Sequence, residues 1–382
     1  MQELKFDDVI HLAGEQVIPN YMAIKLTECK RHLFFVTDRT EHTISRLRNT
    51  LNGQGVEVSS RLFPATDYAQ MMEQVRRFDA TEYQGRKVGI NLTGGTKLMF
   101  AAALKLSEKC GFVPFYIDTE GRKIQFLCGD VDSVPMPTVF STVAEYFNLA
   151  GYEIGNPGRT VSEVLTIPKR RLLRLVWQYR ELMCRVVEKF AEASDRQGNR
   201  KLYAEASDVL EGLTQRYNTG MLWSEWACCR DEDDDWKKTA RLGGGVWLEE
   251  WLMKMFDEGK SRERLVDIRT GLSVRAPSGE NDMQEIDITF TDGYRLYLME
   301  CKAGKVIQEH VQKLENLRRG LGGAFGVAVL CSLNSPTEAL RERIALGTIS
   351  LVADEALPQL PQYVFKVVPG RCYTKVSDFG KC

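Results

Sequence analysis

The sequence predicts an α/β protein with a Rossmann-like N-terminal domain, a helical connector and a C-terminal α+β domain. Up to about residue 130, short β-branched segments alternate with amphipathic segments, which is typical of a parallel sheet with crossover helices. After residue 243, two neighbouring apolar segments are joined by a tight turn, which indicates antiparallel strands. Because 382 residues normally form two or three domains, we expect domains at 1–135, 136–240 and 241–382.

In the N-terminal domain, apolar segments predict the strands of the sheet, and the amphipathic segments between them predict helices. A further segment, residues 123–128, can add an edge hairpin. The expected strands are residues 9–12, 32–37, 56–63, 87–92 and 112–118, and the expected helices include residues 40–51, 68–78 and 98–106.

Residues 137–238 lack this alternation and predict a helical connector, either a small helical module or a winged-helix module. One helix is expected at residues 172–190, because apolar side chains recur along one side of it, and another at residues 203–213. The acidic run at residues 231–235 predicts a solvated loop, because like charges repel and extend the chain.

The C-terminal domain shows a mixture of helical and strand patterns. Asp292-Gly293 stands between two apolar segments and is a strong signal for a hairpin. The expected helices are residues 247–256, 306–319 and 336–345, and the expected strands are residues 265–274, 285–290, 294–301, 324–331 and 348–352.

The composition excludes several classes of protein. The 51 basic and 52 acidic residues give a formal net charge of −1, so nucleic-acid binding would need a local cluster of Lys and Arg. The ten cysteines form no CxxC pair and no zinc-binding pattern. No apolar segment reaches the ~18 residues that span a bilayer, and the first residues lack the pattern of a secretory signal. We therefore expect a cytoplasmic protein with reduced thiols and no membrane partner.

Charged residues flank the predicted hairpin in a pattern that suggests catalysis. Asp287 precedes the turn, and Glu300-Cys301-Lys302 ends the following strand. Residues two apart in a strand share a face, so Glu300 and Lys302 point the same way, and antiparallel pairing can bring Asp287 beside them. Two carboxylates on one face form a hard oxygen site for Mg²⁺ or Mn²⁺, to which the Cys301 carbonyl can add a ligand. Such an ion can activate water, and Lys302 can stabilise developing negative charge, which together suit attack on a phosphodiester.

The helix at residues 247–256 can supply a third carboxylate. When its apolar side chains pack into the core, either Glu249 or Glu250 can face the metal, and we favour Glu249 by its spacing from Gly245. An ExK triplet on a strand is common among ordinary charged residues. The ordered set of helix carboxylate, Asp, hairpin and ExK is what indicates a nuclease.

A glycine-rich turn, Asn-Leu-Thr-Gly-Gly-Thr-Lys at residues 91–97, follows an expected strand and opens a helix. Loops after parallel strands form the ligand crevice of such sheets, and a helix N-terminus with hydroxyls and a lysine favours an anionic ligand. The turn lacks GxxxxGK[ST] and GxGxxG, which excludes a Walker NTPase and a nicotinamide site. The alternative is an ordinary turn with a threonine as helix cap. The candidate ligand contacts are Thr93, Gly94, Gly95, Thr96 and Lys97.

A second loop, residues 14–20, follows the first expected strand and can flank the same crevice. Its polar residues Gln16 and Asn20 are candidate contacts to a base or a ribose. Taken alone, each is more typical of a turn.

Residues 243–352 resemble the PD-(D/E)xK endonuclease superfamily, through Asp287, the Glu-Cys-Lys triplet and the helix that follows. The resemblance also implies a supporting role for Glu285, and Gln308 or Gln312 would contact substrate or metal or lie on the surface. The resemblance implies that the catalytic residues are Glu249, Asp287, Glu300 and Lys302, and that the metal ligands are Glu249, Asp287, Glu300 and the Cys301 carbonyl.

Residues 5–135 resemble the CARF domain, the CRISPR-associated Rossmann fold, through the Gln-Val-Ile-Pro-Asn loop and the Leu-Thr-Gly-Gly-Thr-Lys turn. A CARF domain and a PD-(D/E)xK domain on one chain resemble the ancillary nucleases of type III CRISPR systems. The resemblance implies a homodimer that binds one cyclic oligoadenylate, usually cyclic tetra-adenylate, across its two-fold axis. Binding would reposition nuclease domains that cut single-stranded RNA, DNA or both with Mn²⁺ or Mg²⁺ in antiviral defence.

Two other functions fit parts of the sequence. One is a DNA nickase or repair nuclease with a different effector. The other is a ligand-regulated transcription regulator, whose middle helices read DNA and whose nuclease-like domain is inactive, although the intact Asp287, Glu300 and Lys302 argue against inactivity. Cleavage of the activator by the protein itself stays open, because no base for that reaction stands out.

Overall fold

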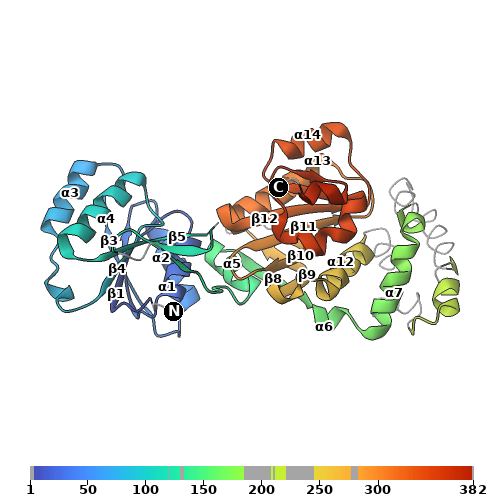
Figure 1. Ribbon diagram of the computed structural model, residues 1–382, viewed down its shortest axis with the longest axis horizontal. Coiled ribbons are helices and arrows are strands. Elements are labelled where there is room, and N and C mark those ends of the chain that lie inside the picture. Colours follow the sequence, from blue (N-terminus) through green and yellow to red (C-terminus); the bar gives the residue numbers. More distant parts are fainter. Residues whose placement is uncertain are drawn as a thin grey trace. The chain divides into compact units, whose positions relative to one another are not determined.

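The computed structural model shows two compact units, Met1–Glu153 and Ile154–Cys382 (Figure 1). The acidic run at 231–235 and most of the expected helix at 203–213 lie outside the described residues. None of the described helices is both long and apolar enough to cross a membrane. The residues that the structure describes are 4–119, 121–129, 133–184, 208–209, 211–220, 245–276 and 283–380.

The first unit contains a seven-stranded mixed sheet with the strand order β3-β2-β1-β4-β5-β6-β7. Strands β1 to β5 are parallel, and β6 and β7 continue the sheet as antiparallel strands. The predicted parallel sheet and edge hairpin are therefore confirmed. The strands are β1 (Asp8–Leu12), β2 (Arg31–Val36), β3 (Glu57–Leu62), β4 (Val88–Asn91), β5 (Val113–Asp118), β6 (Lys123–Phe126) and β7 (Ser133–Pro135).

Helices α3 and α4 pack their apolar sides against the same face of this sheet. Met71 and Val75 of α3 and Met99 of α4 join strand residues such as Ile10 and Ile90 in one core cluster. Burial of such side chains is the main stabilising contribution to the unit. The helices are α1 (Ile18–Leu26), α2 (Glu41–Leu51), α3 (Tyr68–Arg77), α4 (Lys97–Cys110), α5 (Val143–Ala150) and the 3₁₀ turn η1 (Thr81–Tyr83).

Helix α1 corrects the interpretation of residues 14–20 as a loop, because the helix already begins at Ile18. Pro19 lies in its first turn, where a missing N–H costs nothing and the fixed φ suits the helix. Asn20 is consequently a buried helical residue.

The second unit contains another seven-stranded mixed sheet, with the order β14-β13-β12-β11-β10-β9-β8. Strand β10 is antiparallel to both β9 and β11, and β11 to β14 are parallel. The predicted fold class, an α/β protein with a mixed helix-and-strand C-terminal domain, is thus confirmed, and each unit contains a mixed sheet. The strands are β8 (Glu153–Thr160), β9 (Val266–Arg275), β10 (Gln284–Thr291), β11 (Leu296–Lys302), β12 (Gly326–Ser332), β13 (Ser350–Ala353) and β14 (Cys372–Tyr373).

Strand β8 corrects the interpretation of residues 137–238 as a helical connector, because this part of it belongs to the second sheet. Its Asn-Pro-Gly sequence has low strand propensity, but it lies at the sheet edge beside β9, where proline is tolerated. The N–H of Asn156 donates to the Ser273 hydroxyl at 2.9 Å. Tertiary pairing therefore overrides local propensity here.

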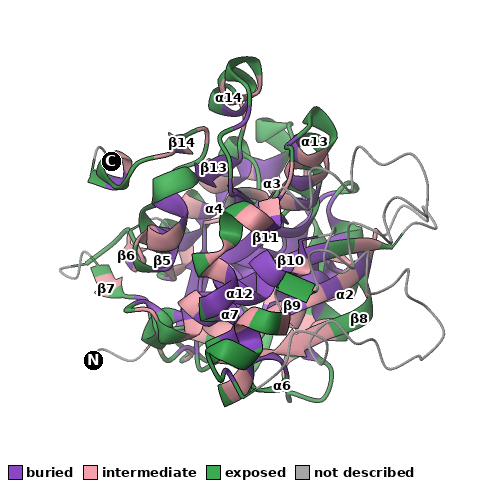
Figure 2. Ribbon diagram, turned by 90° about the vertical axis from the view of Figure 1, so that its right-hand side faces the viewer, coloured by how far each residue is buried: buried purple, intermediate pink, exposed green. Residues whose placement is uncertain are grey.

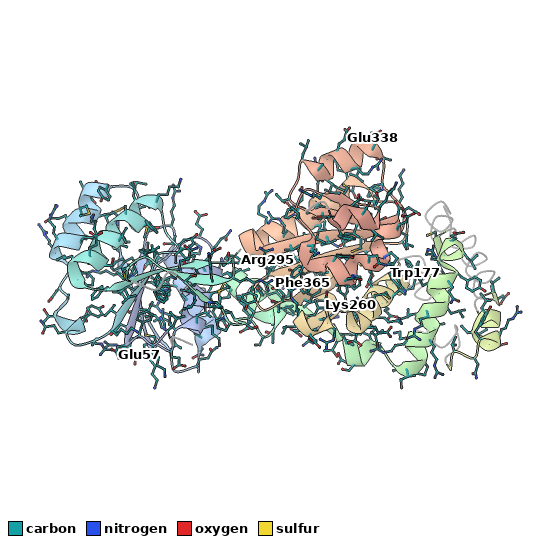
Figure 3. The ribbon with its side chains drawn as sticks, in the orientation of Figure 1. Glu57, Trp177, Lys260, Arg295, Glu338 and Phe365 are labelled. Atoms are coloured by element: carbon teal, nitrogen blue, oxygen red, sulfur yellow. The ribbon has the colours of Figure 1, made fainter. Side chains whose placement is uncertain are left out.

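Helix α12 packs against the sheet and is buried along most of its length, as are β10 and β11 (Figure 2). Trp177 of α7, labelled in Figure 3, stacks on Trp251 of α12 with ring centroids 3.6 Å apart. The helices are α6 (Val161–Val164), α7 (Ile167–Gln178), α12 (Val246–Glu258), α13 (Gln308–Leu317), α14 (Glu338–Ala345) and α15 (Leu360–Tyr363). The shorter helical segments are η2 (Arg262–Arg264), η3 (Arg318–Gly322), η4 (Gly323–Phe325), η5 (Asp354–Gln359), η6 (Val364–Lys366) and η7 (Val376–Gly380).

Candidate nuclease site and ligand loops

The paired part of β10 and β11 stops next to the candidate nuclease site. The register runs from Thr291 opposite Leu296 to Ile288 opposite Met299. Beyond that pair, the carboxylate of Asp287 accepts the backbone N–H of Cys301 at 2.6 Å. A side chain thus takes a strand N–H, which holds the Asp287 carboxylate beside the end of β11.

Three of the four predicted catalytic residues come together at this point: Asp287, Glu300 and Lys302, which form the triad. Lys302 Nζ lies 2.7 Å from Glu300 Oε1 and 3.9 Å from Asp287 Oδ2. Glu300 is only 3% exposed, so its ion pairs are shielded from solvent. This is the arrangement expected from two strands that present Asp287, Glu300 and Lys302 on one face.

A second lysine, which the sequence analysis did not select, also contacts Glu300. Lys313 on α13 places Nζ 3.0 Å from Glu300 Oε2, so each oxygen of Glu300 faces an ammonium group. His310 lies one helical turn before Lys313. Burial lowers the pKa of His310, and the nearby positive charge of Lys302 lowers it further. The spacing of His310 and Lys313 by three residues on a helix directly after the triplet was the available signal.

The structure separates Glu249 from Glu250. Thr270 Oγ1 lies 3.5 Å from Glu249 Oε2, and Glu249 interacts electrostatically with Asp287. Glu250 is fully buried and accepts instead from Lys169 of α7 at 2.8 Å, with Arg159 of β8 3.6 Å away. Glu249 therefore belongs to the environment of the triad, and Glu250 to an ion pair that ties α12 to α7.

Burial and mutual repulsion disfavour the charged forms of two of the three carboxylates. Burial, with repulsion from Asp287, raises the pKa of Glu249 well above its ordinary value. Burial, with repulsion from Glu300, raises the pKa of Asp287 to about 6. Burial also opposes ionisation of Glu300, but Lys302 and Lys313 bring the pKa of Glu300 below its ordinary value. Buried carboxylates that repel each other form an environment that a cation would stabilise.

Hard oxygen donors of this kind fit Mg²⁺ or Mn²⁺. In the described ranges no three His, Cys, Asp or Glu side chains already form a metal-binding group, and the ammonium of Lys302 lies between Asp287 and Glu300. The ligand set Glu249, Asp287, Glu300 and the Cys301 carbonyl stays a prediction. Of the predicted supporting residues, Glu285, Gln308 and Gln312 are exposed.

The predicted ligand loops meet at the centre of the first sheet. Strands β1 and β4 are parallel neighbours, and the chain passes from β1 to β2 on one side and from β4 to β5 on the other. Such a switch point is where open α/β sheets bind ligands. A Cβ on Gly94 would lie 2.1 Å from the Leu12 carbonyl oxygen, and one on Gly14 would lie 3.5 Å from the Gly95 nitrogen. The two loops are therefore in direct contact.

Three of the predicted ligand contacts have internal partners. The Thr93 hydroxyl donates to Asn91 and accepts the N–H of Ile117. The Thr96 hydroxyl caps α4 through Met99 N–H and donates to the Ala65 carbonyl. Asn20 donates to Leu12 O at 3.1 Å. These side chains hold the loops in place, whereas Gln16, Gly95 and Lys97 are exposed.

Comparisons with known proteins match each of the two units to a family model. Residues 9–146 match the family model of the Card1 CARF domain, and residues 236–368 match that of the Card1-like endonuclease domain. The chain thus combines a CARF domain with an endonuclease domain. A search of curated protein sequences gave no match.

Solved structures with the same fold extend the likeness of this CARF-domain endonuclease over almost its whole length. Can2 from Sulfobacillus thermosulfidooxidans in complex with cyclic tetra-adenylate has a TM-score of 0.70 at 17% identity, covering 94% of this chain and 96% of its own. VC1899 from Vibrio cholerae has a TM-score of 0.68 at 15% identity, covering 94% and 97%. A type III CRISPR defence DNA nuclease activated by cyclic oligoadenylate has a TM-score of 0.54 at 18% identity, covering 91% and 48%. At these identities the likeness shows the fold alone.

Proposed function

We propose that this CARF-domain endonuclease is a metal-dependent phosphodiester hydrolase, activated by a cyclic oligoadenylate and acting in type III CRISPR antiviral defence. The observation that carries the proposal is the convergence of Asp287 from the middle of β10 with Glu300 and Lys302 at the end of β11, inside the segment that matches an endonuclease family. Neither a binding module nor a transcription regulator needs a partly buried lysine between two buried carboxylates. We therefore favour cleavage of single-stranded RNA, DNA or both over regulation by DNA binding.

Each side chain of the nuclease site has a defined task in the proposed reaction. Glu249, Asp287, Glu300 and the Cys301 carbonyl would hold Mn²⁺ or Mg²⁺. When bound, such an ion lowers the pKa of a water ligand and neutralises charge on the phosphate. Burial acts against the charge of Lys302, but Asp287 and Glu300 raise its pKa above the ordinary value, so it remains an ammonium group. Lys302 can then donate hydrogen bonds to the oxygen on which negative charge develops.

The activator would bind where the loops after β1 and β4 meet. Lys97 opens α4 and is exposed, so it can contact a phosphate at a helix N-terminus, and Gln16 on the facing loop can contact a base or a ribose. The similar fold of Can2, whose structure contains cyclic tetra-adenylate, supports this ring as the ligand. A ring with two-fold symmetry suits a homodimer in which each CARF domain contributes the same loops.

The test is cleavage of single-stranded RNA, single-stranded DNA and plasmid with Mn²⁺ or Mg²⁺, in the presence of cyclic tri-, tetra- or hexa-adenylate. We expect cleavage with cyclic tetra-adenylate, no cleavage after chelation, and a loss of at least about a hundredfold in Glu300→Ala or Asp287→Ala. Lys97→Ala should need more activator. Unchanged cleavage by Glu300→Ala would refute the site, and a shifted duplex probe without cleavage would favour the regulator.

The dimer has its own measurement. Titration calorimetry should give one cyclic tetra-adenylate for every two chains, and sedimentation should show a dimer at the same concentration. One ring bound by each monomer would contradict the shared site.

A further inference from the structure

A chain of buried polar side chains crosses the sheet of the CARF domain next to the ligand loops. It begins at Asn91 at the end of β4, passes through His11 in β1 and ends at His32 in β2. Asn91 Nδ2 lies 3.2 Å from His11 Nδ1, and His11 Nε2 lies 2.9 Å from His32 Nδ1. These residues are at most 2% exposed, so solvent cannot replace a lost partner.

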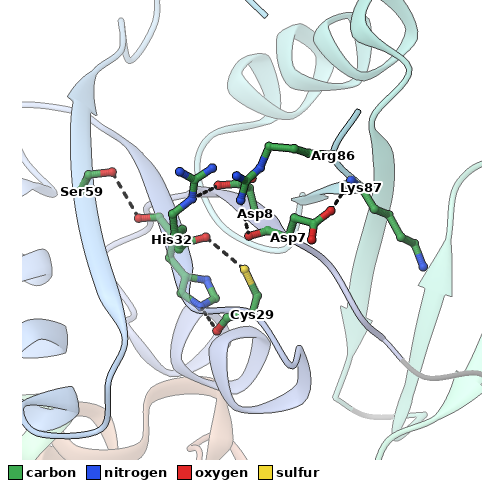
Figure 4. Close-up of polar contacts among 8 residues, drawn as sticks. Asp7, Asp8, Cys29, His32, Ser59, Arg86 and Lys87 are labelled. Atoms are coloured by element: carbon green, nitrogen blue, oxygen red, sulfur yellow. Dashed lines mark hydrogen bonds and ion pairs between the residues drawn. The ribbon is translucent and has the colours of Figure 1, made fainter. Parts of the chain in front are cut away.

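Both ends of the chain fix the direction of its hydrogen bonds. The N–H of Thr93 can only donate, so Asn91 turns Oδ1 toward it at 3.1 Å and turns its NH₂ group toward His11. The carbonyl of Cys29 can only accept, so His32 Nε2 donates to it at 3.1 Å (Figure 4). His32 Nδ1 is then an acceptor, which requires His11 to donate from Nε2 and accept at Nδ1. The two ends independently require the same tautomer, with the proton on Nε2 of each histidine.

Asn91 also connects the two ligand loops. Its second N–H donates to Asn20 Oδ1 at 3.3 Å, and its Oδ1 accepts from the Thr93 hydroxyl at 2.7 Å as well as from the Thr93 N–H. Asn20 donates in turn to Leu12 O at the end of β1. Asn91 therefore joins the turn after β4 to the first turn of α1, and all four hydrogen-bonding positions of its amide are in use.

We propose that Asn91 and His11 are positioning residues for the cyclic oligoadenylate, because they hold the loops that carry Gln16 and Lys97 in the geometry that the ligand requires. The proposal rests on the proposed function. Neither residue touches the ligand, since both are fully buried. Loops that are already ordered lose less entropy on binding, so the chain contributes to affinity.

Both rings must be neutral for this chain to form. A proton on His11 Nδ1 would face the NH₂ group of Asn91, and a proton on His32 Nδ1 would face His11 Nε2–H. Burial lowers the pKa of His11 well below its ordinary value, and burial lowers that of His32 to about 4, against smaller opposite effects of Cys29 and Asp8. The neutral state that the geometry needs is therefore the stable one.

The first experiment compares three variants by calorimetric titration with cyclic tetra-adenylate. His11→Phe keeps the ring stack on Phe34, whose centroid lies 4.5 Å from that of His11, but removes the acceptor for Asn91. We expect its affinity to fall about tenfold, with cleavage at saturating ligand unchanged. His11→Asn keeps an oxygen acceptor near the position of Nδ1 and should lose at most about threefold. Leu47→Ala changes a buried residue of α2 that takes no part in the hydrogen-bond chain, so it is the control for instability. Its affinity for the ligand should stay within about twofold of the parent.

Either of two results would overturn the proposal. One is an equal loss of affinity in His11→Phe and Leu47→Ala at matched melting temperatures, which would mean that only stability matters. The other is a His11→Asn variant as weak as His11→Phe.

A second measurement does not depend on the ligand. The chain has four histidines, so long-range ¹H–¹⁵N spectra of the intact protein can assign each ring. His11 and His32 should both carry the proton on Nε2 in the parent, and His32 should lose this single tautomer in His11→Phe. A proton on Nδ1 of either ring in the parent would refute the proposed chain of hydrogen bonds. If the tautomers are as expected but no cyclic oligoadenylate binds the parent, the proposed function is wrong, whereas the hydrogen-bond chain stands.

Discussion

Glu249 and Glu250 are adjacent in the sequence, but their carboxylates lie in opposite environments. Glu249 is repelled by Asp287, whereas Glu250 is paired with Lys169 and Arg159. A buried carboxylate without a full counter-charge reduces stability, and a buried paired one is costly to remove. The two residues therefore make a matched pair of sites for separating catalysis from stability.

Glu249→Gln should lower metal-dependent cleavage at least about tenfold while leaving the free energy of unfolding unchanged or higher, because a repelled charge is removed. Glu250→Gln should instead lower that free energy by about 3–5 kcal/mol, because the ion pair with Lys169 is lost. Urea unfolding followed by tryptophan fluorescence and cleavage assays measure both effects. The reverse pattern would exchange the roles of the two residues.

Lys313 should contact the phosphate backbone of the substrate, because its ammonium lies at Glu300 and is about one third exposed. Lys313→Ala should raise KM, and the slope of log affinity against log salt should fall by about 0.7–0.9. Lys313→Arg keeps the charge and should keep the slope. An unchanged slope in Lys313→Ala would limit Lys313 to holding Glu300.

At the scale of elements, the ligand crevice depends on how closely the turn after β4 approaches the end of β1. Gly94 allows that approach because a Cβ there would meet the Leu12 carbonyl, whereas a Cβ on Gly14 has ordinary contact distances. The carbonyl is backbone, so it cannot rotate away as a side chain can. The turn is thus specified by contact between two strands that are far apart in the sequence.

Gly94→Ala should therefore separate the two loops and weaken binding of cyclic tetra-adenylate by at least about tenfold. Gly14→Ala, on the facing loop, should bind within about threefold of the parent because its Cβ fits. Calorimetric titration measures both affinities. Normal binding by Gly94→Ala would show that the crevice lies elsewhere.

At the scale of the whole molecule, the two units carry buried groups whose pKa values are shifted in ways that oppose each other. His32 has a folded pKa of about 4, below its unfolded value near 6.5. The contribution of neutral His32 to the stability of the first unit is therefore fully present above pH 6.5 and is lost as the pH falls toward 4. Asp287 has a folded pKa of about 6, above its unfolded value, so its unit gains stability as the pH falls through 6.

Lowering the pH from 7.5 to 5.0 without metal should therefore destabilise the first unit by about 2 kcal/mol through His32, and relieve about 1 kcal/mol of repulsion in the second through Asp287. All six tryptophans follow residue 153, so their fluorescence reports the second unit, and hydrogen exchange reports the first. In His32→Gln the acid sensitivity of the first unit should shrink. Equal pH responses in both units would contradict these assignments.

Local pattern was sufficient for the strands and helices with a strong period and for residues that lie close together in the chain. The parallel strands of the first sheet, the hairpin at Asp292-Gly293 and the pairing of Glu300 with Lys302 all follow from alternation and strand geometry. These features depend on neighbours within one or two elements, so the sequence contains their signals.

Contacts between distant segments decided the rest. The strand at Glu153–Thr160 exists because β9 pairs with it, against its own propensity. Lys169 of α7 pairs with Glu250, so that Glu249 rather than Glu250 lies near the triad, and this depends on helix packing that no local period encodes. The chain from Asn91 through His11 to His32 brings together residues up to 80 positions apart, and only the parallel register of three strands places their ring and amide atoms within hydrogen-bonding distance.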